Sequence, residues 1–110
     1  MNCRNIWKKE EGEMNPVLND ETRTVSFGEK TNTLTNKEYG ILSYLMENAG
    51  EICSSEQIYQ TVWDAEPFDC RLIISVHIRH IREKIEKDPS HPSLIKAFWG
   101  RGYRFEKDAM

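Results

Sequence analysis

Four isoleucines on one side of a long predicted helix constrain the fold more than any other feature of this sequence. They lie in the segment RLIISVHIRHIREKIEK, residues 71–87, and recur at i, i+4, i+7 and i+11. On an α-helix this spacing gathers them within about 40° of the first one, as a single aliphatic stripe that must pack against other elements. The sequence therefore predicts a helix from about Arg71 to Asp88 with one side facing a core. The four residues are Ile74, Ile78, Ile81 and Ile85.

The opposite side of this helix is basic and also carries aliphatic side chains. In a DNA major groove an aliphatic side chain can contact a thymine methyl group, while Arg, Ser and His can bond base edges or phosphates. The acids Glu83 and Glu86 lie in the C-terminal half, which favours entry of the groove by the N-terminal half. A solvated amphipathic helix with ordinary surface charges accounts for the pattern equally well. The exposed side contains Leu72, Ser75, Val76, Arg79, His80, Glu83 and Lys87, with His77 and Arg82 on its flanks.

The charge of the chain is divided unevenly. The formal net charge is −3, yet residues 1–70 hold 6 Lys or Arg against 13 Asp or Glu, which gives 6 − 13 = −7. Residues 71–110 hold 9 against 5, which gives 9 − 5 = +4. A basic part in an acidic chain weakly favours an anionic partner for that part.

Length and composition indicate one domain in a cytoplasmic protein. The 110 residues suit a single domain at 16–107, with an N-terminal tail or linker at 1–15 and a C-terminal tail at 108–110. No apolar segment approaches the roughly 18 residues that span a bilayer, and the N-terminus lacks the apolar run of a secretory signal. The cysteines form no CxxC pair, which indicates reduced thiols. They are Cys3, Cys53 and Cys70.

The order of predicted elements is a small sheet, three helices and a hairpin. The pieces PVLN, RTVSF and KTNTL alternate with turn signals and favour a small antiparallel sheet. Capping boxes at Thr35 and Ser54 open two helices, and Gly50 can end the first of them. LIKAF and GYRFE flank the tight turn WGRG, so a β-hairpin follows the long helix. This order predicts a winged helix-turn-helix.

The hairpin turn projects one guanidinium. Gly100 and Gly102 bracket Arg101, so little shields its side chain. Narrow minor grooves concentrate negative potential and attract an inserted Arg. A hairpin with an Arg tip beside a groove-reading helix is therefore a coherent DNA-binding arrangement.

Metal binding and catalysis have little support. His77 and His80 are three residues apart and Cys70 lies near them, but a metal site needs a further well-placed ligand. No nucleophile, base and orienting group can be paired, and the sequence has no phosphate-binding loop. We therefore expect neither an enzyme, nor a cofactor, nor a metal site.

Three ordered segments resemble one known family. LTNKEYGILSYLMENAGEICSSEQIYQTVW, VHIRHIREKIE and FWGRGYRFE look like the OmpR/PhoB-type winged-helix effector domain of bacterial two-component response regulators, with details closest to the VanR-like branch. The resemblance covers about residues 16–107. It implies an α+β fold with a four-stranded N-terminal antiparallel sheet, three helices and a C-terminal β-hairpin wing.

The resemblance also implies roles for individual side chains, with the helix at 71–88 in the major groove and the wing at 99–102 in the minor groove. Base reading is implied for Ser75, Val76, Arg79 and His80, and DNA-backbone contact for Trp63, His77, Arg82 and Tyr103. Minor-groove contact is implied for the wing position that Trp99 occupies, and RNA polymerase contact for Asp64, Glu66, Phe68 and Asp69 in the loop Asp64–Cys70. Where the sequence departs from the family pattern, Arg71 is expected to make a backbone contact and Arg101 a minor-groove contact.

The sequence departs from the family pattern at three places. His80 stands where relatives commonly have a base-contacting Arg. Histidine as a residue type has a shorter side chain than arginine and an ordinary pKa near neutrality. Trp99 stands where relatives often have Arg, so we assign the minor-groove role to Arg101. RLII stands where relatives often have Arg or Asn followed by Thr, so Arg71 is expected to take over the entry contact.

The resemblance implies several partners. Two copies would bind head-to-tail on a direct-repeat DNA operator, and RNA polymerase would contact the loop. The sequence offers no phosphoacceptor aspartate with its acidic pocket, so the receiver domain is expected to be absent from this chain. The alternative from another class is a winged helix that binds proteins and has no specific DNA target.

Overall fold

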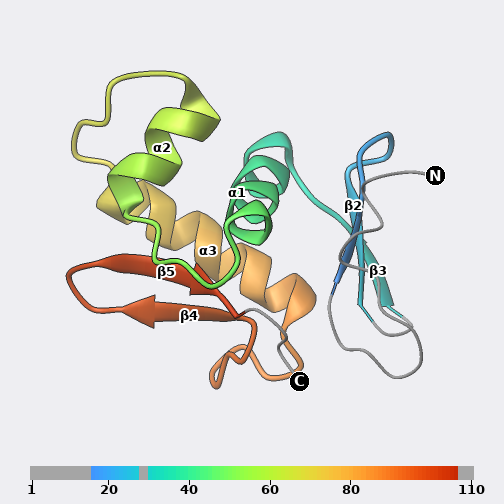
Figure 1. The fold of residues 1–110 in the computed structure, drawn as a ribbon. Helices are drawn as coiled ribbons and strands as arrows, with labels where there is room; N and C mark the ends of the chain where they lie inside the picture. Colours follow the sequence, from blue (N-terminus) through green and yellow to red (C-terminus); the bar gives the residue numbers. More distant parts are fainter. Residues whose placement is uncertain (1–15, 28–29, 107–110) are drawn as a thin grey trace.

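The computed structural model describes residues 16–27 and 30–106 (Figure 1). The tails at 1–15 and 108–110 lie outside the described residues, as does Lys107. Three short strands are followed by three helices and a hairpin, as the sequence order predicts. The elements are β1 (Val17–Asn19), β2 (Thr24–Phe27), β3 (Lys30–Thr33), α1 (Asn36–Glu47), α2 (Ser55–Trp63), α3 (Arg71–Ile85), β4 (Ile95–Phe98) and β5 (Gly102–Phe105).

The N-terminal sheet has three antiparallel strands in the order β1-β2-β3, and the prediction of four strands is wrong for the described residues. A turn at 20–23 separates β1 from β2, and each strand is only three or four residues long. In this turn the Asn19 side chain accepts hydrogen bonds from the backbone N–H groups of Glu21 and Thr22, at 2.9 and 3.2 Å. The sequence pieces themselves indicate three strands; the fourth came from the resemblance.

Both predicted capping boxes are confirmed. The Thr35 hydroxyl accepts from the backbone N–H of Glu38, whose carboxylate accepts from the Thr35 N–H, at 3.1 and 3.0 Å. Ser54 and Gln57 make the same reciprocal pair at the start of α2. Each pair satisfies two backbone donors that a helix N-terminus leaves free. Gly50 has a φ of +91° after the end of α1, as its residue type predicts.

The core lies where α1, α2 and α3 meet the hairpin. The four isoleucines of α3 are buried, as their spacing predicts, and they pack with the aliphatic side of α1. Each such side chain contributes roughly 1.5–3 kcal/mol on burial. The buried residues of α1 are Ile41, Leu42, Leu45 and Met46, and Ile58 of α2 and Phe105 of β5 complete the centre.

Helix α3 ends at Ile85, three residues before the predicted end at Asp88. Glu86 already has an extended backbone, with a φ of −85° and a ψ of 141°. Its buried carboxylate accepts hydrogen bonds from the backbone N–H groups of Ser93, Leu94 and Ile95. This carboxylate ties the loop after α3 to the helix end, so the chain turns away earlier than propensity alone predicts.

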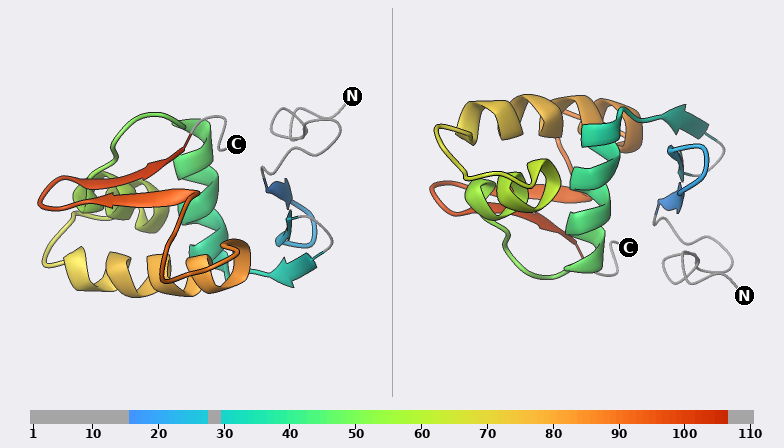
Figure 2. Two further views of the ribbon diagram at one scale, coloured as in Figure 1. Left: turned by 90° about the horizontal axis from the view of Figure 1, so that it is seen from below. Right: turned by 90° about the horizontal axis from the view of Figure 1, so that it is seen from above.

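The hairpin and the N-terminal sheet lie at opposite ends of the helical body. Figure 2 shows the turn between β4 and β5 extending beside the start of α3, whereas the sheet lies beyond α1 on the other side. Cys53, between α1 and α2, forms a two-bond bridge with Tyr103 of β5, with N···O distances of 2.7 and 2.9 Å. The hairpin is therefore fixed to the link between the first two helices.

Candidate nucleic-acid interface

The outer side of α3 is open to solvent. Leu72 is 74% exposed and Val76 is 41% exposed, and the side chains of Arg79 and His80 are also exposed. Ser75 is half-buried, and its hydroxyl donates to the Leu72 carbonyl at 3.0 Å. Burial of this side against another element would have excluded a groove-facing role, and the structure shows no such burial.

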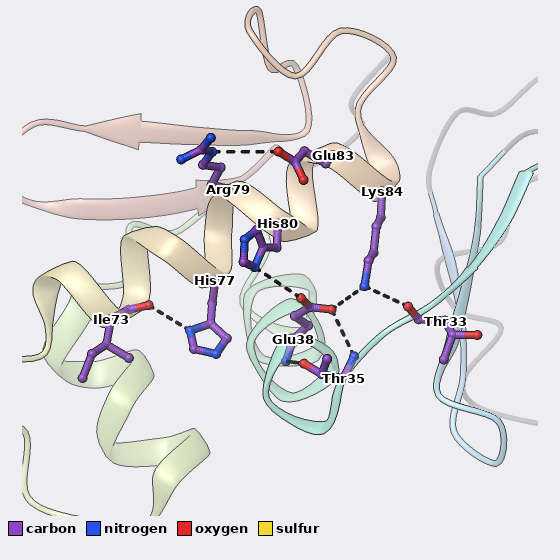
Figure 3. Close-up of polar contacts among 9 residues, drawn as sticks. All are labelled: Thr33, Thr35, Glu38, Ile73, His77, Arg79, His80, Glu83 and Lys84. Carbon is purple, nitrogen blue, oxygen red and sulfur yellow. Dashed lines mark hydrogen bonds and ion pairs between the residues drawn. The ribbon is translucent and has the colours of Figure 1, made fainter.

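Arg79 has only a loose partner within the protein. Its Nε lies 3.8 Å from a carboxylate oxygen of Glu83, one turn later on α3 (Figure 3). Exposed pairs of this kind contribute little, about 0–1 kcal/mol. The guanidinium can therefore leave Glu83 at little cost and bind an external anion or base edge.

His80 lies at the edge of the exposed side and faces α1. Figure 3 shows its ring directed toward the Glu38 carboxylate, with 3.9 Å between Nδ1 and Oε2. The other oxygen of Glu38 accepts from Lys84 Nζ at 2.7 Å, and Lys84 also donates to the Thr33 carbonyl. Glu38, at the start of α1, thus contacts His80 and Lys84 in the C-terminal half of α3, and Lys84 links this group to the end of β3.

The pKa of Glu38 is lowered. Burial raises the pKa of this carboxyl, but the hydrogen bonds from Lys84 and the Thr35 N–H and the nearby positive charges of Lys84 and His80 together outweigh burial. The carboxylate form is therefore favoured in the folded protein.

Replacing Glu38 with Gln is expected to lower the free energy of unfolding by about 1–2 kcal/mol near neutral pH. Glutamine keeps the capping box but removes the charge that faces Lys84. Because the folded-state pKa is below the ordinary 4.5, the stabilisation is present above that pH and is lost as the pH falls through the folded-state value. Urea denaturation should show the gap between wild type and variant closing on acidification below 4.5. A gap that stays constant would mean that charge is not the cause.

An aromatic cluster lies beside the flank of α3. The Trp63 ring stacks on Tyr59 with centroids 4.7 Å apart, and the His77 ring meets Trp63 edge-on at 5.3 Å. His77 Nδ1 lies 2.8 Å from the Ile73 carbonyl, which leaves Nε2 for an outside partner. Lys37 Nζ lies 5.0 Å from the Trp63 centroid, a neighbour that the sequence reasoning missed because α1 is remote in the chain.

Arg82 is half-buried and engaged within the protein. Its Nε and Nη2 donate to the Ile95 carbonyl at 3.2 and 2.8 Å, and its guanidinium lies 6.0 Å from the Tyr103 centroid. The Glu86 carboxylate accepts a hydrogen bond from the backbone N–H of Ile95. Together Arg82 and Glu86 fix β4 to α3 and so set the position of the wing relative to the exposed side of α3. A DNA-backbone role for Arg82 stays a prediction.

A groove separates the N-terminal half of α3 from the wing. Trp99 is 98% exposed at its rim, and Arg101 lies at the tip, where Gly100 has a φ of +77°. Arg71 lies within 3.4 Å of Glu56 but remains largely exposed. The groove brings together residues predicted for base reading, for contact with the DNA backbone and for contact with the minor groove. Its lining includes Arg71, Leu72, Ser75, Trp99, Arg101 and Tyr103.

The loop Asp64–Cys70 is exposed except for Pro67, which is half-buried, and its last residue, which is buried. Asp64 and Asp69 have φ values of +55° and +53°, Phe68 is 84% exposed, and Glu66 is exposed. Burial raises the pKa of the Cys70 and Cys53 thiols, so both are poor nucleophiles.

The described residues contain neither a cluster of metal ligands nor a helix that could span a membrane. Among residues 16–27 and 30–106, no group of three or more His, Cys, Asp or Glu side chains could hold a metal ion. In the same part of the chain, no helix is long and apolar enough to cross a membrane.

Comparison with known proteins gives consistent matches. Residues 28–105 match the family model described as "Transcriptional regulatory protein, C terminal". Regulatory protein VanR of Enterococcus faecium is 41% identical over 92 residues, covering 83% of this chain and 40% of VanR. The uncharacterized transcriptional regulatory protein YrkP of Bacillus subtilis (strain 168) is 44% identical over 89 residues, covering 80% and 38%. The chain thus spans about two fifths of the length of these relatives.

Solved structures agree in fold. The response regulator DrrB of Thermotoga maritima, described as an OmpR/PhoB homolog, matches with a TM-score of 0.73 and 32% identity, over 90% of this chain and 44% of DrrB. The DNA-binding domain of CpxR from E. coli matches with a TM-score of 0.71 and 31% identity, over 89% and 95%.

Proposed function

Since this chain belongs to the family of C-terminal domains of transcriptional regulatory proteins, the OmpR/PhoB type of winged-helix DNA-binding domain, we propose that it binds a specific double-stranded operator as the output domain of a two-component response regulator. The family comprises DNA-binding regulators and is not a class of enzyme. One observation carries the specific proposal: the exposed side of α3 and the wing tip flank one groove, and both present positive charge.

The proposed complex places the two basic elements in different grooves. The N-terminal half of α3 enters the major groove, where Arg79 bonds base edges and Ser75, Val76 and His80 read nearby positions. The wing lies over the minor groove, where Arg101 meets the concentrated negative potential and Trp99 lies against the backbone. Phosphate contacts come from the groove rim, from the aromatic cluster and from Arg82 on the flank of α3. These flanking residues are Trp63, Arg71, His77, Arg82 and Tyr103.

The partners of the complete regulator are further proposals. Two copies bind head-to-tail on a direct repeat, and the exposed loop Asp64–Cys70 contacts RNA polymerase. The 84% exposure of Phe68 within that loop supports a protein contact there. The domain acts in the cytoplasm, where the DNA is.

Replacing Arg79 with Ala is expected to weaken binding to the preferred operator by about 1–3 kcal/mol, because the base contact is lost.

Replacing Arg101 with Ala is expected to reduce the slope of log affinity against log salt by about 1. The operator is first isolated by selection from random DNA, and binding is then measured by fluorescence anisotropy.

Lys87 provides a matched control for these charges. It is exposed just beyond the end of α3, away from the groove, so Lys87→Ala should change the salt slope least. If selection enriches no sequence, or if Arg79→Ala and Arg101→Ala bind DNA as wild type does, the domain is a protein-interaction module instead.

A further inference from the structure

Helix α3 has three exposed aliphatic side chains, Leu72, Ile73 and Val76, and two of them lie one turn apart. Leu72 and Val76 are separated by four residues, so their side chains lie on the same side of the helix. The buried stripe of isoleucines contains neither of them. A single exposed leucine is ordinary on a protein surface. Leu72 lines the groove between α3 and the wing, and Val76, one turn later, is exposed just beyond the groove lining. With Arg79 one turn further, the two side chains form an apolar contact surface that continues from the groove along α3.

The surroundings of Leu72 indicate what covers it. Leu72 and Ser75 line the same groove as Arg71 and Arg101, the two charged residues of its lining, and both are positive. Arg71 lies 3.4 Å from Glu56, so the uncompensated charge at the groove is mainly that of Arg101. The first turn of α3 contains no acidic residue. This combination suits a polyanion with small apolar groups on its surface. In the major groove the one apolar group on a base edge is the C5 methyl of thymine.

On the basis of the proposed function, we infer that Leu72 is a second methyl-reading residue beside Val76, and that the operator half-site carries two thymines whose methyl groups these side chains contact. The spacing follows from the helix. Four residues rise about 6 Å along an α-helix, and base pairs rise about 3.4 Å. The two thymines are therefore about two base steps apart along the groove.

Uracil substitution tests this pairing directly. Deoxyuridine lacks only the C5 methyl group of thymidine and keeps the hydrogen-bonding edges. Each thymine of the selected operator is replaced in turn, and affinity is measured for the wild-type chain. Two positions about two steps apart should each lose about fourfold in affinity, which corresponds to about 0.8 kcal/mol for one buried methyl group.

Variants then assign each methyl to one side chain. Leu72→Ala should bind the unmodified operator and the operator that lacks the methyl group assigned to Leu72 equally well. It should still lose affinity when the methyl group assigned to Val76 is removed. Val76→Ala should do the reverse. Phe68→Ala is the control, because Phe68 is 84% exposed but lies in the loop before α3. RNA polymerase, the partner proposed for that loop, is absent from the binding assay, so both sensitivities should persist. Thermal melting checks that each variant folds, which the exposure of these side chains favours.

The outcomes separate this inference from the proposed function. If selection enriches an operator but no uracil substitution weakens binding, or if Leu72→Ala keeps both sensitivities, the methyl-reading role of Leu72 is overturned while specific DNA binding stands. If Leu72→Ala instead abolishes only the cooperative binding of two copies, Leu72 contacts a neighbouring copy and the inference is also overturned. If selection enriches nothing, both proposals fail.

Discussion

Replacing Gly102 with Ala is expected to lower the free energy of unfolding by at least about 3 kcal/mol. Gly102 has a φ of +142°, which side chains rarely adopt. A Cβ at this position would lie 2.1 Å from the Cys53 carbonyl oxygen and 2.7 Å from its carbon. These are backbone atoms that cannot swing aside. The Gly102 backbone must therefore move away from Cys53, and the two hydrogen bonds between Cys53 and Tyr103 are expected to be lost. Urea denaturation measures the change.

Gly100 is the matched control for this substitution. It also has a positive φ, +77°, but a Cβ added there would meet nothing within 4 Å. Gly100→Ala should therefore cost only the conformational term of about 1–2 kcal/mol. Equal losses for the two variants would show that the close approach to Cys53 does not matter. Because the bridge positions the wing, Gly102→Ala should also weaken operator binding more than Gly100→Ala does.

Replacing Glu86 with Ala is expected to cost about 3 kcal/mol or more. The carboxylate accepts hydrogen bonds of 2.9 Å from the N–H groups of Ser93, Leu94 and Ile95, and it is buried. Hydrogen bonds to a charged group contribute about 1.5–3 kcal/mol each, and a buried donor without a partner is costly. The loss appears as a lower midpoint of urea unfolding.

Glu83 isolates the effect of these bonds. It lies one turn earlier on α3, is exposed, and contacts only the loosely paired Arg79 among the side chains for which a contact is described. Glu83→Ala should change stability by no more than about 0.5 kcal/mol. A Glu86→Ala variant as stable as Glu83→Ala would contradict the anchoring role of Glu86. Glu86→Gln, which keeps one acceptor, should fall between the two.

Local sequence signals predicted much of this fold. The isoleucine spacing of α3, the capping boxes at Thr35 and Ser54, and the glycines around Arg101 depend on residues within one or two turns of each other. Such features follow from backbone geometry alone. For the same reason, the exposed side of α3 could be identified before its surroundings were known.

The remaining features depend on contacts between distant segments. The sequence indicates only that Glu86 is an acid in the C-terminal half of the helix, because its three N–H partners come from a loop whose path the sequence does not specify. The resemblance implies a DNA-backbone contact for Arg82, but no local pattern indicates that its guanidinium also bonds the Ile95 carbonyl. No local pattern marks the link at Cys53 as a strand partner, and only the folded chain brings it beside Tyr103. The interactions of His80 with Glu38 are equally non-local.

The division of α3 into two sides has an evolutionary consequence. The isoleucines that hold the domain together and the side chains proposed to choose its target share one helix but no positions. After gene duplication, a copy can change Leu72, Ser75 or Val76 without disturbing the packing of the domain. New regulatory targets can therefore arise by a few surface substitutions, each tolerated by the same scaffold, and paralogues can diverge in their targets while keeping one fold.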